Sequence, residues 1–103
     1  MTNAKKLTAG ALLLLATAAL AKDAKDIYLE KCSICHGADG AGKTAKGRKL
    51  KAKDVRDSAL KVTAAEMMMI VEHGKGSSMY AYGKELSKDQ IKEIVEHYRG
   101  LAK

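Results

Sequence analysis

The pentapeptide Cys32-Ser33-Ile34-Cys35-His36 is the stretch of sequence that decides the fold. It places two thiols three residues apart and follows the second one directly with an imidazole. Residues three apart on a helix lie on the same face, so both thiols can reach one flat ligand. The spacing C-x-x-C-H is typical of the attachment sequence for c-type haem, in which each thiol adds to one vinyl group of the porphyrin. The ring of His36 then follows at a place from which it can bind the iron.

Three other interpretations of the two cysteines stay open from the residues alone. A thioredoxin-like dithiol has the same C-x-x-C spacing, but it expects a βαβ unit, of which the sequence shows no pattern. A structural zinc ion needs four ligands, and the chain offers only two cysteines with His36, His73 and His97. A Cys32–Cys35 disulfide could form after export, but it would leave the small core unfilled. We therefore expect one haem c, covalently bound through Cys32 and Cys35, with His36 as an iron ligand.

The N-terminal residues 1–21 have the pattern of a secretory signal peptide that is cleaved. Lys5 and Lys6 form a positive region, and an apolar run follows that ends at a small-x-small site, Ala19-Leu20-Ala21. Cleavage there would leave residues 22–103 as an exported, periplasmic protein without stable membrane insertion. The alternative is a retained anchor, although the apolar run of 14 residues is shorter than the roughly 20 that a spanning helix needs.

Residues 22–103 form a single domain that is small for a self-sufficient hydrophobic core. They contain neither Trp nor Phe, and their aromatic side chains are Tyr28, Tyr80, Tyr82 and Tyr98. An apolar cofactor at the centre of the domain would supply the core that these residues lack.

The clearest secondary-structure pattern is a helix over residues 87–102. Ser87 and Gln90 form a Ser-x-x-Gln capping box at its start. Apolar residues then recur at steps of three and four, which places them on one face of a helix. These residues are Ile91, Ile94, Val95, Tyr98 and Leu101.

A second helix is predicted over residues 64–73. Thr63 and Glu66 make another capping box, and Gly74 stands where a helix-ending glycine belongs. Weaker patterns predict a first helix and a short helical turn, at residues 24–35 and 54–59. No alternation typical of β-strands stands out, so we expect an all-α fold.

With this motif among helices, the chain resembles the bacterial class I monohaem c-type cytochromes over residues 22–103. That family has an aromatic side chain four residues before the first Cys, and Tyr28 fills this place. Ala24 and Tyr98 fit the small residue and the aromatic residue at the crossing of the first and last helices, and His-Gly-Ala-Asp-Gly at 36–40 looks like the bacterial members. The resemblance implies a cytochrome c fold, with three to five helices wrapped around one covalent haem.

The resemblance also implies a second iron ligand, a Met on the loop before the last helix. Met79 fits that position, and Tyr80 stands where the family often has Pro, which favours a more mobile loop. Met67, Met68 and Met69 are consecutive on a predicted helix, where successive residues turn by about 100° and cannot all face one site. We expect one or two of them to line the haem pocket rather than to bind the iron.

The function implied is that of an electron carrier, not an enzyme, in which one iron passes between Fe(III) and Fe(II). Ligation by His36 and Met79 would give a higher reduction potential than ligation by two His. A second ligand from His73 or His97 is an alternative, although we expect both at the surface. Another alternative is a small haem peroxidase or haem-based ligand sensor with a labile distal ligand. That function requires an open iron site and distal acid–base groups.

The charge of the chain is strongly basic, with a formal net charge of +7, and an excess of five basic residues remains in residues 22–103. Seven basic residues cluster in one segment, at Lys43, Lys46, Arg48, Lys49, Lys51, Lys53 and Arg56. This segment is either a solvated loop or a docking face that steers redox protein partners with acidic surfaces. We expect a monomer, and we do not expect nucleic acid as a partner, because an exported protein would not normally meet it.

Processing and haem attachment give the first prediction. The protein purified from the periplasm should begin at Lys22 and carry one haem that survives extraction with acidic acetone, because thioether bonds hold it. Intact-mass spectrometry measures both properties at once. A mature chain without the mass of a haem would contradict the assignment of Cys32 and Cys35.

Overall fold

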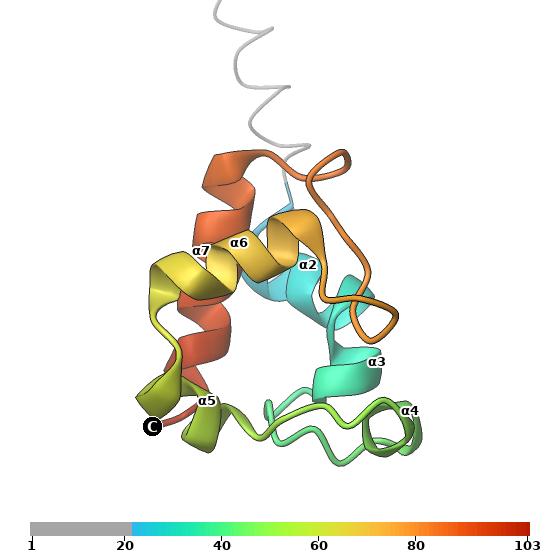
Figure 1. Cartoon of the computed structure of the whole chain (residues 1–103). Helices are drawn as coiled ribbons and strands as arrows, with labels where there is room; N and C mark the ends of the chain where they lie inside the picture. The colour runs from blue at the N-terminus through green and yellow to red at the C-terminus, as the bar shows by residue number, and fades with distance from the viewer. Residues whose placement is uncertain (1–21) are drawn as a thin grey trace, which may run out of the picture.

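The computed structural model describes residues 22–103, and the expected signal peptide, residues 1–21, lies outside the described residues. The described part is all-α, as predicted, and its helices are arranged as Figure 1 shows. They are α2 (Ala24–Lys31), α3 (Ser33–His36), α4 (Ala45–Lys49), α5 (Val55–Lys61), α6 (Ala64–His73) and α7 (Lys88–Gly100). The sequence predicted four of these segments; there are six because the first predicted helix is divided in two and because α4 forms where a loop was expected.

The division between α2 and α3 falls at Cys32. The backbone of Cys32 has φ −111° and ψ −33°, at the C-terminal end of α2. Its amide donates to the Tyr28 carbonyl at 2.9 Å, and its own carbonyl accepts from the His36 amide at 3.0 Å. Cys32 therefore belongs to the hydrogen bonding of both helices.

Both predicted capping boxes are present. Thr63 Oγ1 accepts from the Glu66 amide at 3.1 Å, and Glu66 Oε1 accepts from the Thr63 amide at 3.4 Å. Ser87 Oγ accepts from the Gln90 amide at 3.1 Å, and Gln90 Oε1 accepts from the Ser87 amide at 2.9 Å. Gly74 ends α6 with φ 78°, which favours glycine. The start of α6 and α7 and the end of α6 are thus determined by local sequence.

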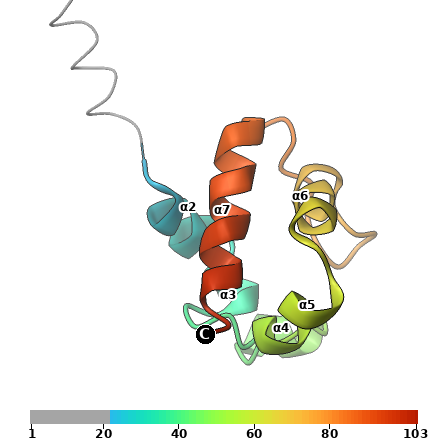
Figure 2. The same cartoon turned by 90° about the vertical axis from the view of Figure 1, so that its left-hand side faces the viewer.

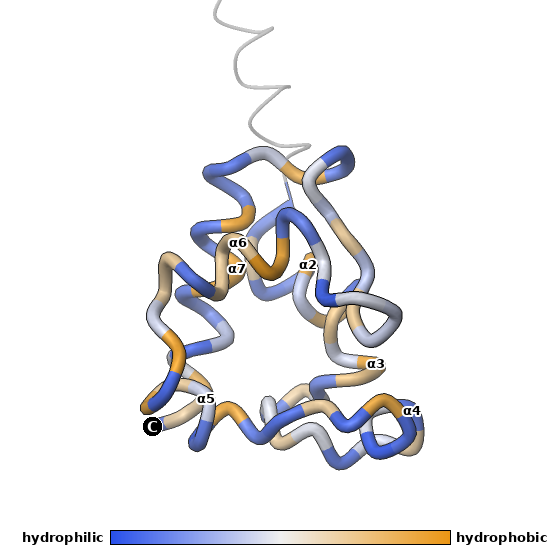
Figure 3. The backbone as a smooth tube through the Cα atoms, in the orientation of Figure 1, coloured by the Kyte–Doolittle hydropathy of each residue, from blue (hydrophilic) through white to orange (hydrophobic). Residues whose placement is uncertain are grey.

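The last helix, α7, lies between α2 and α6 and contacts both (Figures 1 and 2). The residues of its predicted stripe face these neighbours: Ile91, Ile94 and Val95 are each only 2% exposed. The residues that meet them from α2 and α6 are Ile27, Tyr28, Met67 and Val71. Figure 3 shows the corresponding alternation of hydrophilic and hydrophobic residues along α7. The core is therefore a thin apolar layer on the two sides of one helix.

The three consecutive methionines of α6 have three different environments. Met67 is buried, Met68 is partly buried against the core, and Met69 is 61% exposed. The rotation of about 100° between successive helical residues separates them. This confirms that they cannot all face one site.

At the crossing of α2 and α7, aromatic rings pack against one another. Tyr28 is 1% exposed, and its ring centroid lies 6.1 Å from that of Tyr98 and 5.0 Å from that of His97. Ala24 packs against the hydrophobic core cluster that includes Tyr28, as expected of a small residue at this crossing. The expectation that His97 lies at the surface was wrong, because its ring is half-buried against Tyr28.

Helix α4 lies in a segment for which the sequence predicts a polar loop. Thr44 caps it by accepting from the Gly47 amide at 2.9 Å, and the same hydroxyl donates to the Ile34 carbonyl at 2.6 Å. A Cβ atom on Gly47 would overlap the carbonyl oxygen of Cys35. The backbone of α4 therefore packs directly against α3, at a distance that only glycine permits.

The short turn predicted over residues 54–59 is α5, which is longer by two residues at its end. Asp54 caps it and accepts from the Arg56 amide at 2.9 Å. The segment after α5 is attached to α7 by Arg99, whose Nη1 donates to the Val62 carbonyl at 2.7 Å. These contacts fix the chain between α4 and α6.

Replacing Tyr98 should measure how much the packing at the α2–α7 crossing contributes to stability. Tyr98→Ala removes a ring that packs on Tyr28, so the free energy of unfolding should fall by about 3 kcal/mol. Tyr80→Ala is the matched control, because Tyr80 is 63% exposed and should cost less than about 0.5 kcal/mol. Denaturant titration compares the two variants. Equal effects would place Tyr98 outside the core.

Replacing Gly47 tests the close packing of α4 on α3. Gly47→Ala should lower the free energy of unfolding by about 1–3 kcal/mol, the usual cost of overpacking, because the new methyl group meets the Cys35 carbonyl. Gly100→Ala is the control, since no atom lies within 4 Å of a Cβ there, and it should stabilise α7 by up to about 1 kcal/mol. Thermal or denaturant unfolding distinguishes them. A stabilising Gly47→Ala would show that α4 is free to move away.

Candidate haem site

The two cysteines of the motif lie on adjacent turns with free thiols. Cys32 is 8% exposed and belongs to the core cluster, whereas Cys35 is half-buried. Burial raises the pKa of the Cys32 thiol to about 11, so this thiol is protonated at neutral pH. Both sulfur atoms are therefore available for thioether bonds, and the structure contains no disulfide between them.

His36 is the last residue of α3 and directly follows Cys35. Its ring packs edge-on against Tyr98, with the centroids 5.2 Å apart. Burial lowers the pKa of the imidazole and favours its neutral form. The Nδ1 atom is buried and has no hydrogen-bond partner. An unpartnered buried nitrogen is rare in folded proteins, and a neutral imidazole is the commonest metal ligand, so this site fits a haem iron.

Tyr28 fixes the backbone on both sides of the motif. Its carbonyl accepts from the Cys32 amide at 2.9 Å, and its hydroxyl donates to the Gly37 carbonyl at 2.6 Å in a buried hydrogen bond. Burial, with a smaller effect of Tyr98, raises the pKa of Tyr28, so the hydroxyl stays a donor at neutral pH. The resemblance predicted an aromatic residue at this position but not its hydrogen bond to Gly37.

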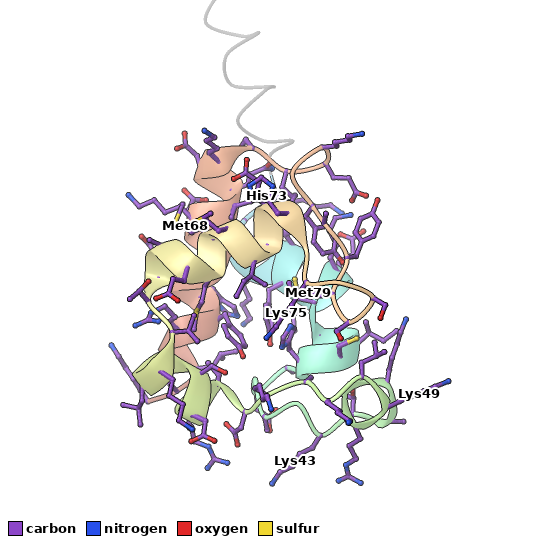
Figure 4. The ribbon with its side chains drawn as sticks, viewed as in Figure 1. Lys43, Lys49, Met68, His73, Lys75 and Met79 are labelled. Carbon is purple, nitrogen blue, oxygen red and sulfur yellow. The ribbon has the colours of Figure 1, made fainter. Side chains whose placement is uncertain are left out.

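Met79 lies on the loop between α6 and α7. Its side chain is partly buried and packs against the core cluster to which Cys32 belongs. Its backbone is held in a tight turn, in which its carbonyl accepts from the Lys75 amide at 3.0 Å. In Figure 4, Met79 lies towards the middle of the molecule, whereas Lys43 lies at its lower edge and Lys49 at its right-hand side. The structure thus brings Met79 to the cluster that contains one of the attachment cysteines.

The two other histidines have different surroundings. His73 ends α6 on the surface, with a side chain 67% exposed and its Nε2 3.8 Å from Glu72 Oε2. This confirms the surface position expected for His73. His97 packs on Tyr28, as described above.

Among residues 22–103, no three side chains of His, Cys, Asp or Glu are grouped so that they could hold a metal ion. Between Lys22 and Lys103, no helix combines the length and the apolar character needed to cross a membrane.

Three residues that sequence reasoning missed help to position this site. Thr44 and Gly47 hold α4 against α3, and Tyr82 joins the Met79 loop to the end of α2. Thr44 has the signal of a helix cap, a Thr at the start of a short helix. The other two have no local signal, because their partners are distant in sequence.

Comparison with known proteins agrees with the geometry. The family model of cytochrome c oxidase, cbb3-type, subunit III matches residues 19–97. A solved structure described as KustC0563 c-type cytochrome is similar with a TM-score of 0.73 and 26% sequence identity, covering 80% of this chain and 100% of that chain. A search of curated proteins finds no match. The chain therefore belongs to the family of cytochrome c oxidase, cbb3-type, subunit III, and is a monohaem c-type cytochrome that transfers electrons through one haem c bound covalently to Cys32 and Cys35.

Proposed function

We propose that this protein is a one-electron carrier in which His36 and Met79 bind the haem iron. One observation carries the proposal: His36 directly follows the motif's two cysteines, whose thiols are free. The Nδ1 atom of its ring is buried and has no hydrogen-bond partner. The packing of Met79 against the cluster that contains Cys32 supports it as the second ligand. When bound, the haem supplies an iron that changes between Fe(III) and Fe(II).

The residues around the motif restrain its backbone. Tyr28 bonds to the first residue of the motif and to the residue that follows it, and Gly47 allows α4 to pack against the Cys35 carbonyl. A site that changes little in structure between two charge states needs little reorganisation, which suits a carrier. Apolar neighbours such as Met67 and Val71 exclude water, and burial is one of the factors that set a haem potential.

Removing the sulfur atom of the Met79 side chain tests the second ligand. Met79→Ala should abolish the weak long-wavelength band of the oxidised protein that arises from a sulfur–iron bond. It should also lower the reduction potential, since a Met ligand raises it, and allow CO to bind. Absorbance spectra and a redox titration of the haem-bound protein measure these effects.

The controls are the methionines of α6. Met67→Ala, which changes a buried side chain, and Met69→Ala, which changes an exposed one, should both keep the band. A band that survives in Met79→Ala but disappears in Met67→Ala would make Met67 the ligand. A wild-type protein without the band would instead favour a His ligand or an open iron site, and with it the peroxidase or sensor alternative.

We also propose that residues 1–21 direct the chain to the periplasm, where residues 22–103 act as a monomer on acidic redox proteins. The basic segment, defined as residues 43–56, holds seven basic residues and one acidic residue. The rest of residues 22–103 holds ten basic and eleven acidic residues. All seven basic side chains of the segment are exposed, and one of them, Arg56, pairs with Asp54 at 2.7 Å. The net positive charge of residues 22–103 is therefore concentrated in the basic segment.

The salt dependence of electron transfer tests this docking face. Oxidation by the anion hexacyanoferrate(III) should slow steeply as salt rises, because exposed charges are screened over about 8 Å at physiological ionic strength. Lys49→Glu with Lys51→Glu should slow the reaction at low salt more than Lys88→Glu with Lys92→Glu, which changes the net charge equally on α7. Stopped-flow absorbance measures the rates. Equal slowing by the two pairs would mean that the basic segment is only a solvated loop.

A further inference from the structure

The loop that carries Met79 has no proline to restrain it, yet its end is fastened to α6. The Tyr82 amide donates to the Val71 carbonyl at 2.9 Å, and the Gly83 amide donates to the Glu72 carbonyl at 3.0 Å. A Cβ on Gly83 would come within 2.8 Å of the Glu72 carbonyl oxygen, so the two backbones touch. The sequence analysis favoured a more mobile loop, but these contacts attach its end to the last turn of a core helix.

The side chain of Tyr82 reaches a second helix. Its hydroxyl donates to the Lys31 carbonyl at 3.2 Å. Lys31 is the last residue of α2 and directly precedes Cys32. An ion pair runs beside this hydrogen bond, with Lys31 Nζ 3.4 Å from Glu85 Oε2. One residue of the Met79 loop is therefore joined to α6 through its backbone and to α2 through its side chain.

The interruption of the helix at Cys32 explains why the Lys31 carbonyl is available. In a continuous helix this carbonyl would accept from the amide of Cys35. Here the Cys35 amide donates to the Cys32 carbonyl at 3.3 Å instead. The carbonyl at the end of α2 then needs another donor, as helix ends do, and the Tyr82 hydroxyl supplies it.

We propose that Tyr82 is a positioning residue for the second iron ligand. It holds the Met79 loop at a fixed place relative to the backbone that carries Cys32, and so takes over the restraint that a proline after Met79 would give. This inference rests on the proposed function, in which Met79 binds the iron. Burial, followed by the nearby Cys32 thiol, raises the pKa of Tyr82, so its hydroxyl remains a donor at neutral pH.

The experiment compares Tyr82→Phe with Tyr80→Phe in the haem-bound protein. Both changes remove one hydroxyl and keep the ring, but Tyr80 is 63% exposed, and its ring packs edge-on against that of Tyr82 at 5.0 Å. Tyr82→Phe should increase the rate of CO binding to the reduced protein by about tenfold, the size expected from one lost hydrogen bond. It should also weaken the sulfur–iron band of the oxidised protein. Tyr80→Phe should match the wild type in both.

Two further measurements distinguish a local effect on the Met79 loop from a general loss of stability. Haem content in Tyr82→Phe should equal that of the wild type, and the loss of global stability, followed by circular dichroism, should be no larger than that expected from one hydrogen bond. An unchanged CO rate and band would overturn the proposal, and so would changes that only follow a fall in global stability. Met79→Ala is measured in parallel. If it leaves the wild-type band intact, the proposed ligand itself is wrong, which is a different failure from that of Tyr82.

Discussion

Tyr28 is the residue on which the attachment site depends, because it bonds to the chain at the start of the motif and directly after its end. Its carbonyl receives the Cys32 amide, and its hydroxyl bonds to the carbonyl of Gly37. A haem held by two thioether bonds cannot shift to suit its surroundings, so the backbone beneath it must already have the right form. The ring of Tyr98 packs on both Tyr28 and His36. Tyr98 of the final helix therefore supports the geometry of a motif that lies more than sixty residues before it.

Because the sequence contains no Phe and no Trp, its tyrosines both fill the core and form hydrogen bonds. Tyr28 and Tyr82 fill space in or beside the core, as Phe would, and each also donates a hydrogen bond to a backbone carbonyl near the motif. Buried tyrosines normally need such a partner for the hydroxyl. In a domain with a thin core, this use of tyrosine obtains packing and precise positioning from the same side chains.

The helices with local signals could be predicted from the sequence, and those shaped by distant contacts could not. The capping boxes of α6 and α7 involve residues three apart, and both helices lie where predicted. The close packing of α4 against α3 depends instead on the contact of Gly47 with Cys35, which are distant in sequence. The same holds for the site: the motif predicted the haem cysteines, but the roles of Thr44 and Tyr82 arise from partners that only folding brings near.

The uneven placement of charge described for residues 43–56 has a consequence for the molecule as a whole. Since the remainder of residues 22–103 is slightly acidic, the centres of positive and negative charge do not coincide. The protein is therefore an electric dipole, and the field of an approaching partner exerts a torque on it before any contact forms. Rotation in that field turns the helix α4 side towards a negative surface, which would bring the proposed docking face forward before contact.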